Sequence, residues 1–251
     1  MIMDTRPLIS VITITYNASA TLPVTMKSVA EQTFTGFEHI VVDGASTDDT
    51  IMIARRMGTP TLRIVSEPDK GLYDAMNKGL RLARGRYVIF LNSGDRFHAA
   101  DTLQIYADAI ECRNPDIIYG DTDIVDSEGK RLGPRHLSAP DILTADSFSN
   151  GMLICHQAFM VRKDIAPKYD TDYRFSADYD WCIKCIKASR AGDRVNLRRV
   201  TIDYLSDGLT DHNKKASLIE RFKIMAAHYG TLKAIGSHLS FIPRVMKRGK
   251  L

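Results

Sequence analysis

The stretch Arg86-Tyr-Val-Ile-Phe-Leu-Asn-Ser-Gly-Asp95 decides the fold, because an apolar run stops abruptly in a polar turn that ends on a carboxylate. Residues 87–92 predict a buried strand, and the Ser-Gly pair predicts a turn directly after it. In an open α/β sheet, ligands bind at the carboxyl edge of the strands. A lone carboxylate at that edge suits a hard divalent cation shared with substrate phosphates. The plainer alternative is that Asp95 caps the helix expected from Ala99 onward.

The flanking sequence alternates strand and helix patterns three times in fewer than 100 residues. This alternation predicts a parallel sheet with helices on both faces. The second half of the chain is less regular. The expected strands are 8–15, 38–43, 62–66, 87–92, 116–120, 122–126, 156–161 and 200–204. The expected helices are 20–32, 50–57, 73–84, one that starts at Ala99, 178–191 and 214–229.

The composition predicts one domain with a charged C-terminal appendage. The chain has 251 residues, 44% of them apolar, which is enough for a full core. After Glu220 there are seven basic residues and no acidic one, and subtracting them from the net charge of +4 leaves −3 for the rest. This asymmetry makes the end of the chain a candidate for an anionic surface, the alternative being a solvated helix face and a basic tail.

The termini and cysteines predict a cytoplasmic protein. The N-terminus lacks a basic region followed by a long apolar stretch, and no apolar run approaches the length of a membrane span. Cys182 and Cys185 form a Cys-x-x-Cys, but no second Cys or His pair stands at zinc spacing, so we expect structural thiols.

Three polar sites follow the expected strands: Thr15-Tyr16-Asn17, Asp43-Gly44 and Asn92-Ser93-Gly94-Asp95. In a parallel sheet these ends lie side by side. Asp43 is suited to accept hydrogen bonds from a ribose or a base, and Asp95 to hold a metal. The chain has no Gly-x-Gly-x-x-Gly and no Gly-x-x-x-x-Gly-Lys-Ser/Thr phosphate loop. We therefore expect a metal to neutralise any diphosphate bound there.

Four blocks, in this order and spacing, resemble the motifs of family-2 glycosyltransferases. They are Ser10-Val-Ile-Thr-Ile-Thr-Tyr-Asn17, Val41-Val-Asp-Gly-Ala-Ser-Thr-Asp-Asp-Thr50, Ser66-Glu-Pro-Asp-Lys-Gly-Leu-Tyr-Asp-Ala-Met-Asn-Lys-Gly79 and Phe90-Leu-Asn-Ser-Gly-Asp95. The later segments 149–157, 175–181 and 207–210 support the resemblance, which covers about residues 8–210. The chain resembles the bacterial subgroup that builds exopolysaccharide and O-antigen repeat units and includes a colanic acid transferase.

The resemblance implies an α/β fold of the A type, a Rossmann-like mixed sheet flanked by helices, here with C-terminal helices and a basic tail. It also implies a UDP- or GDP-linked sugar donor, Mg²⁺ or Mn²⁺, and inversion at the anomeric carbon. Asp178 matches the catalytic base, Asp95 the last acid of the metal motif and Asp43 the base- and ribose-binding aspartate. The other expected nucleotide-binding residues are Thr15, Tyr16, Asn17, Asn77, Asn92, Ser93 and Gly94.

Two positions depart from the family pattern. Ser93 replaces the first acid of the metal motif, so the cation has one carboxylate fewer. Ala177 replaces the Glu before the catalytic acid, which leaves Asp178 as the base and Asp180 as its rival. On a helix these two carboxylates point about 200° apart, so only one can face the cleft.

Six further residues are candidates for contacts with the donor, the acceptor or the diphosphate. Lys70 and Asp74 lie in a segment that can cover the nucleotide, and Asp74 and Asn77 are equally suited to capping. Trp181 is either a wall of the acceptor site or a core residue. His156 either bonds the diphosphate or the acceptor or is a structural histidine. The remaining candidates are Gln157 and, as a late metal ligand, His212.

We therefore expect an inverting, metal-dependent sugar transferase that acts on a polyprenyl-diphosphate-linked glycan at the inner face of the bacterial inner membrane. Residues 1–213 are the expected catalytic domain, with a nucleotide half (1–100) and an acceptor half (101–213), and residues 214–251 form the appendage. No nucleic-acid partner is expected, and a homodimer is left open. The alternatives are a sugar nucleotidyltransferase, whose N-terminal phosphate signature is missing, and a non-catalytic sugar-nucleotide-binding protein.

Overall fold

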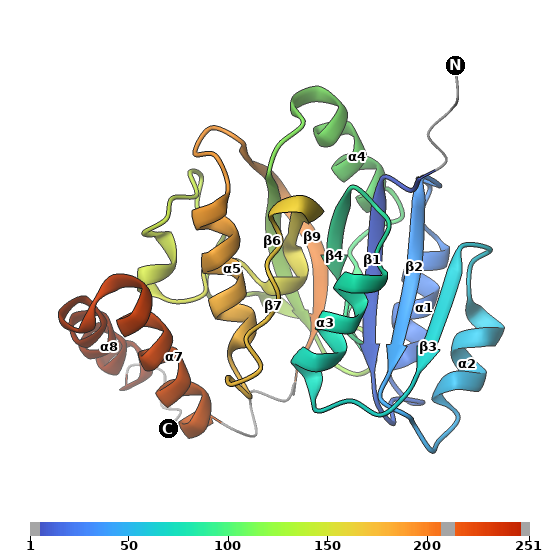
Figure 1. The fold of residues 1–251 in the computed structure, drawn as a ribbon, viewed down its shortest axis with the longest axis horizontal. Helices are drawn as coiled ribbons and strands as arrows, with labels where there is room; N and C mark the ends of the chain where they lie inside the picture. Colours follow the sequence, from blue (N-terminus) through green and yellow to red (C-terminus); the bar gives the residue numbers. More distant parts are fainter. Residues whose placement is uncertain (1–5, 207–213, 247–251) are drawn as a thin grey trace.

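The structure, a computed structural model, describes residues 6–206 and 214–246, with side chains except at residue 214 and residues 239–246. One mixed sheet runs through it, flanked by helices (Figure 1). Its strands are β1 (Ile9–Thr15), β2 (Phe37–Asp43), β3 (Leu62–Ser66), β4 (Tyr87–Phe90), β5 (Arg96–Phe97), β6 (Ile117–Val125), β7 (Arg131–Pro134), β8 (Phe159–Arg162) and β9 (Arg194–Leu205).

The strand order in space is β3-β2-β1-β4-β8-β6-β9-β5, and β7 pairs with β6 beside this path. The first four strands are parallel, as the alternation of strands and helices predicts. β8 then enters antiparallel to both β4 and β6, which makes the sheet mixed. The α/β fold with a mixed sheet is therefore confirmed.

Helices cover both faces of the parallel part of the sheet. In β2, Val41 packs against Leu22 and Met26 in one cluster, whereas Ile40 and Val42 belong to the larger core on the other face. This alternation follows from the two-residue period of a strand. The helices are α1 (Leu22–Ala30), α2 (Thr50–Met57), α3 (Leu72–Leu82), α4 (Thr102–Arg113), α5 (Ala177–Ala188), α7 (Lys214–Tyr229) and α8 (Thr231–Met246).

Four of the expected strands differ from those observed. The strands expected at 116–120 and 122–126 form a single strand, β6, whose pairing with β9 shifts register around Asp121. The strand expected at 156–161 begins only at Phe159, because the 3-10 helix His156–Ala158 precedes it. The strand expected at 200–204 is β9, which already starts at Arg194.

The C-terminal region also differs from expectation. The expected helices end at residue 229, but α8 runs from Thr231 to Met246 and continues through Pro243. Proline removes one hydrogen bond of the helical ladder, and here it does so within the last turn, where little of the helix remains. Ile224, Met225 and Ala234 are fully or almost fully buried in the main core, where α7 packs against α5 and α8 packs against the 3-10 helix Ser147–Asn150. Within the described residues, none of the helices has the length and apolarity to cross a bilayer.

The cysteines are free thiols, as expected for structural residues. Cys182 and Cys185 are completely buried on α5, and this burial raises both thiol pKa values well above the usual range. Buried, protonated thiols are poor nucleophiles and poor metal ligands.

Candidate active site at the carboxyl edge of the sheet

The polar ends of the first strands lie side by side, as the sequence predicts. Thr15 pairs with Asp43, which pairs with Ser66, at the last positions of three neighbouring strands. The next strand joins them, because the N–H of Ser93 donates to the carbonyl oxygen of Ile14 at 3.3 Å. The loops that follow these strands therefore share one edge of the sheet.

Asp43 holds the loop after β2 and the end of β3 together through its carboxylate. It has no exposed surface, and its carboxylate accepts hydrogen bonds from the backbone N–H of Ser46 at 2.9 Å and from the Ser66 hydroxyl at 2.7 Å. The Ser46 hydroxyl donates to its other oxygen. Both carboxylate oxygens are thus bound to Ser46 or Ser66, and the direct contact expected between Asp43 and a base or ribose stays a prediction.

The loops after β1 and β2 are joined to each other in strained conformations. Asn17 and Ala45 both have left-handed backbones, with φ of 45° and 63°. The side-chain Oδ1 of Asn17 accepts a hydrogen bond from the backbone N–H of Thr47 at 2.9 Å. The backbone N–H of Asn17 donates to the Ser46 hydroxyl at 2.8 Å. Strained non-glycine residues persist only where their surroundings hold them, which is common at binding sites.

At the surface of this edge, the exposed ring of Tyr16 lies next to Gly44. Tyr16 is 64% exposed, and a Cβ at Gly44 would come within 2.6 Å of Asp69 Oδ2 and 3.3 Å of the Tyr16 ring. The first three strand-end loops thus meet around Gly44. Beside it, Thr15 is buried, and its hydroxyl has no hydrogen-bond partner among the described residues.

In the segment after β3, Lys70 is exposed whereas Asn77 is buried. Lys70 is exposed, and its backbone N–H donates to Asp74 Oδ2 at 3.0 Å, which fixes the start of α3. Asn77 is only 8% exposed and exchanges two hydrogen bonds with the backbone of Tyr169, at 2.8 and 3.0 Å. Asn77 therefore ties α3 to the residue 169 segment, and the nucleotide contact expected for it stays a prediction.

Asp95 lies almost completely inside the protein, 4% exposed. Gln157 Nε2 donates to its Oδ2 at 2.8 Å, and the N–H of Leu205 donates to its Oδ1 at 3.1 Å. Burial raises the pKa of Asp95 to about 7, although both hydrogen bonds lower it. A carboxylate whose charge is so poorly compensated is suited to a nearby cation. Gln157, expected to contact substrate, instead holds this carboxylate.

In the rest of the Asn92–Asp95 loop, Asn92 and Ser93 supply side-chain oxygen atoms and Gly94 makes a sharp turn. Asn92 Oδ1 is buried and has no hydrogen-bond partner among the described residues, whereas Ser93 Oγ lies 3.0 Å from Thr21 Oγ1. Gly94 has φ of +100°, and a Cβ there would approach Leu205 Cδ2 to 2.7 Å. An orphaned amide oxygen and a buried carboxylate in one loop fit the hard, oxygen-rich donor set of Mg²⁺ or Mn²⁺.

The two acidic residues of α5 have different surroundings. Asp180 is 3% exposed, and its carboxylate contacts His228 Nε2 at 2.7 Å and Lys184 Nζ at 2.6 Å. Asp178 is only partly buried and lies in the first turn of the helix, where the helix dipole favours a negative charge. Of the two, Asp178 is the carboxylate that solvent can reach.

Tyr73 is the residue that the sequence analysis missed. Its hydroxyl donates to Asp178 Oδ1 at 3.1 Å, and its ring, 5% exposed, stacks on Tyr169 with centroids 5.8 Å apart. Burial raises its pKa well above 10, so the phenol stays protonated and remains a donor. Because Tyr73 lies in the first turn of α3, it connects the loop after β3 to Asp178. Its place directly before Asp74 in the 66–79 motif was the available signal.

His156 and Trp181 belong to a buried aromatic cluster. Trp181 has no exposed surface, and its ring stacks on that of Tyr169 with centroids 4.9 Å apart, which favours the core alternative over a wall of the acceptor site. His156 is 3% exposed, its Nε2 lies 2.6 Å from the Tyr169 hydroxyl, and burial lowers its pKa to about 4. A neutral imidazole enclosed in this way has no direct path to a diphosphate. His212 lies outside the described residues.

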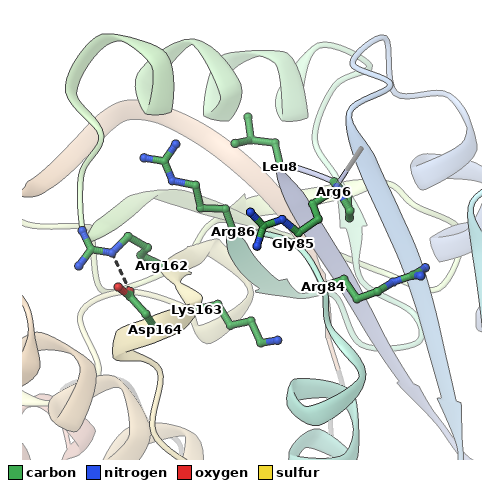
Figure 2. A pocket seen from close by; sticks show the side chains of 9 residues that line it. Arg6, Leu8, Arg84, Gly85, Arg86, Arg162, Lys163 and Asp164 are labelled. Carbon is green, nitrogen blue, oxygen red and sulfur yellow. Dashed lines mark hydrogen bonds and ion pairs between the residues drawn. The ribbon is translucent and has the colours of Figure 1, made fainter. Parts of the chain in front are cut away.

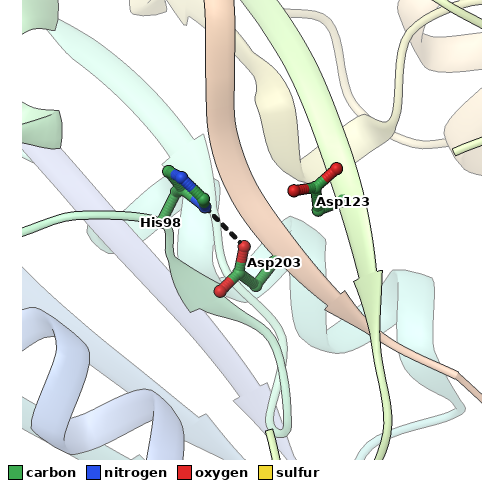
Figure 3. Close-up of side chains that lie close together, drawn as sticks. All are labelled: His98, Asp123 and Asp203. Atoms are coloured by element: carbon green, nitrogen blue, oxygen red, sulfur yellow. Dashed lines mark hydrogen bonds and ion pairs between the residues drawn. The ribbon is translucent and has the colours of Figure 1, made fainter. Parts of the chain in front are cut away.

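A second group of potential metal ligands involves β6 and β9. Donor atoms of His98, Asp123 and Asp203 are within 4.8 Å of one another (Figure 3). Each carboxylate already has a guanidinium partner, however: Arg131 Nε contacts Asp123 at 2.5 Å and Arg96 Nε contacts Asp203 at 2.8 Å. These ion pairs compensate the charge that would attract a cation, so the group fits a metal less well than the Asp95 loop does.

Comparison with known proteins places these features in a family. The model of glycosyl transferase family 2 matches residues 10–169. A PGL/p-HBAD biosynthesis glycosyltransferase of Mycobacterium bovis is 39% identical over 187 residues, which is 71% of this chain and 70% of the relative. TuaG of Bacillus subtilis, whose name assigns it to teichuronic acid biosynthesis, is 32% identical over 162 residues, or 63% of this chain and 64% of the relative.

Two solved structures share the fold. Residues 1–349 of S. aureus TarS superpose with a TM-score of 0.69 and 19% identity, covering 93% of this chain and 72% of that fragment, which has also been solved with UDP-GlcNAc. The mannosyltransferase PcManGT of Pyrobaculum calidifontis, in complex with GDP-Man and Mn²⁺, has a TM-score of 0.61 and 20% identity, over 98% of this chain and 77% of that one. With its motifs, its fold and these relatives, the chain belongs to glycosyltransferase family 2 and is a transferase.

Proposed function

We propose that this enzyme transfers a sugar from a UDP- or GDP-linked donor to a glycan acceptor, with inversion and with a divalent cation. The observation that carries the proposal is the position of Asp178. A partly exposed carboxylate lies in the first turn of α5 and is bound by Tyr73, from the first turn of the helix behind the donor-side loop. This arrangement supports a general base close to the strand ends of the proposed nucleotide pocket.

Asp178 is the proposed base. As the bond to the leaving diphosphate lengthens, the sugar acquires oxocarbenium character and the acceptor hydroxyl must lose its proton. A carboxylate across the ring from the diphosphate takes that proton, and one displacement inverts the anomeric carbon. Tyr73 acts as a positioning residue, because its hydroxyl fixes one oxygen of Asp178 and leaves the other for the acceptor.

Asp95, assisted by the Asn92 amide oxygen, would hold the cation, which would offset the charge that develops on the leaving diphosphate. Support comes from the uncompensated burial of Asp95 and from the Mn²⁺ in the PcManGT complex. Ser93 provides only a hydroxyl, so we propose that the site depends on phosphate oxygens for most of its remaining ligands.

The donor pocket is proposed to lie over Gly44, between the exposed Tyr16 ring and the Lys70 segment. Tyr16 offers a stacking face for a base, and Lys70 carries an exposed ammonium in a loop that can reach phosphates. Asn17 and Asp43 shape this pocket through their loop contacts. The UDP-GlcNAc and GDP-Man complexes of the structural neighbours support a nucleotide-sugar donor but leave the base open.

The acceptor is proposed to be a lipid-linked glycan of a bacterial surface polysaccharide, such as an exopolysaccharide or O-antigen repeat unit. The name of TuaG gives this pathway class its support. The C-terminal helices also expose apolar side chains, with Leu232 87%, Ile219 59% and Leu218 52% exposed. Together with the basic residues of this region they suit peripheral contact with an anionic membrane surface. The basic residues after Met246, which were expected to contribute, lie outside the described residues.

A turnover assay over a panel of nucleotide sugars tests the proposal. We expect release of nucleoside diphosphate that requires both acceptor and Mg²⁺ or Mn²⁺, and product analysis that gives the inverted anomer. Release of pyrophosphate from a nucleoside triphosphate would instead identify a nucleotidyltransferase. Binding of nucleotide sugars without turnover, across a panel of lipid-linked acceptors, would favour a non-catalytic binding protein.

A further inference from the structure

A strongly basic pocket lies at the opposite edge of the sheet from the proposed active site. It has a volume of about 610 Å³ and lies where β1 and β4 begin and β8 ends (Figure 2). Its lining contains five cationic side chains and one carboxylate. The lining residues are Arg6, Pro7, Leu8, Arg84, Gly85, Arg86, Arg162, Lys163 and Asp164.

The acidic groups nearby compensate only part of this charge. Asp164 is paired with Arg162 at 2.7 Å, and Arg162 also contacts Asp116 at 2.6 Å. Arg84, whose side chain is 63% exposed, and Arg63 both form ion pairs with Glu38. The carboxylates at this pocket are therefore already engaged by Arg162 and Arg84.

Arg86 and Lys163 donate hydrogen bonds to neutral oxygens. Arg86 donates to the side-chain oxygen of Asn114, and Lys163 donates to the carbonyl oxygen of Ala83. Both contacts leave the positive charge in place. Arg86 is exposed and Lys163 is half-buried, so a ligand in the pocket can reach them. Like charges gathered around one hollow repel each other unless an anion separates them.

We propose that this pocket binds a phosphate-bearing ligand. Guanidinium groups match phosphate oxygens with paired hydrogen bonds, and several cations in one hollow favour a group with two or more negative charges over a single carboxylate. The pocket and the proposed nucleotide site lie at opposite ends of β1 and β4, so both can be occupied at once. The site is thus independent of the donor diphosphate.

Calorimetric titration with pyrophosphate, in chelator and at low ionic strength, tests this site on the full chain. The double variant R86A/K163A should weaken binding by about tenfold or more, because both lost hydrogen bonds are charge-assisted. The charge-retaining variant R86K/K163R should keep binding within a few-fold. R55A/R56A removes two exposed arginines of α2 and is the matched control for net charge, with binding expected to stay unchanged.

Equal loss in the control and in R86A/K163A would reduce the effect to net charge and overturn the proposal. So would unchanged pyrophosphate binding in R86A/K163A, or acetate binding as tight as that of pyrophosphate. Vesicles of phosphatidylglycerol distinguish the sources of the phosphate. Loss of both vesicle and pyrophosphate binding in R86A/K163A supports a lipid headgroup, and loss of pyrophosphate binding alone supports a soluble phosphate ester.

Discussion

Replacing each acid of α5 in turn separates the proposed base from its buried neighbour. We expect D178N to lose transfer by about 10²- to 10⁴-fold, the usual contribution of a general base, with nucleotide binding retained. The Tyr73 hydroxyl can still donate to the amide oxygen that replaces the Asp178 carboxylate, so the fold should change little. The free energy of unfolding should fall by less than about 1 kcal/mol, mainly through the lost charge at the helix N-terminus.

D180N should have the opposite profile. Asp180 is 3% exposed and accepts two short contacts from charged or chargeable groups, His228 and Lys184. An amide keeps one acceptor oxygen and loses the charge, so one contact is lost and the other is weakened. Hydrogen bonds to charged groups contribute about 1.5–3 kcal/mol each. Since Lys184 is 37% exposed and can turn to water, we discount its share and expect a loss of about 2–3 kcal/mol.

Thermal unfolding and steady-state transfer, measured on the same preparations, check both variants. For a chain of this size, 1 kcal/mol shifts Tm by about 2–4 °C, so D180N should melt about 4–12 °C lower and D178N within about 4 °C of the wild type. Folded D180N should transfer sugar within a few-fold of the wild type. A stable D180N without activity, beside an active D178N, would refute the assignment of the base.

Three other variants and one truncation test the remaining features. Nucleoside diphosphate should bind far more tightly with Mn²⁺ or Mg²⁺ than with chelator, and Asp95→Ala should remove that difference; turnover that survives chelator contradicts the metal site. Tyr73→Phe should lower kcat about tenfold with nucleotide affinity unchanged, because one hydrogen bond to the base is lost. Burial lowers the pKa of His39 to about 4 from 6.5, so the unfolded state binds the extra proton and the free energy of unfolding falls as pH drops from about 6.5 towards 4. Denaturant titrations of His39→Gln should show a shallower fall. Anionic vesicles should bind the full-length protein and release it in high salt, and should bind much more weakly a chain that ends at Gly236, because it lacks the four basic residues that follow.

The sequence predicted the parts of the site that depend on strand periodicity. Thr15, Asp43 and Asn92 each follow an apolar run, and a parallel sheet necessarily brings such ends to one edge. The two-residue period also places Val41 opposite Ile40 and Val42. These features are local, so a few neighbouring residues are enough to predict them.

Exposure of individual polar residues could not be predicted in the same way. Asp43, Asn77, His156 and Trp181 are all residue types that contact ligands, yet each is buried against a partner from another segment. Asn77 meets Tyr169 from 92 positions away, and no local pattern encodes that contact. The expected start of β8 was wrong for a related reason. Residues 156–161 are buried throughout, and no polar residue marks the boundary between the 3-10 helix, which ends at Ala158, and the strand, which begins at Phe159.

The sheet order shows that the expected nucleotide half and acceptor half are interleaved in one sheet. β5, from the first 100 residues, pairs with β9 at the far end of the sheet, and Asp95 accepts hydrogen bonds from Gln157 and Leu205 of the second half. Asp178, from the second half, is in turn held by Tyr73 of the first. Each half therefore supplies a carboxylate that the other half positions. The division at residue 100 therefore does not separate two independent structural units, because each proposed functional carboxylate depends on hydrogen bonds from the other half.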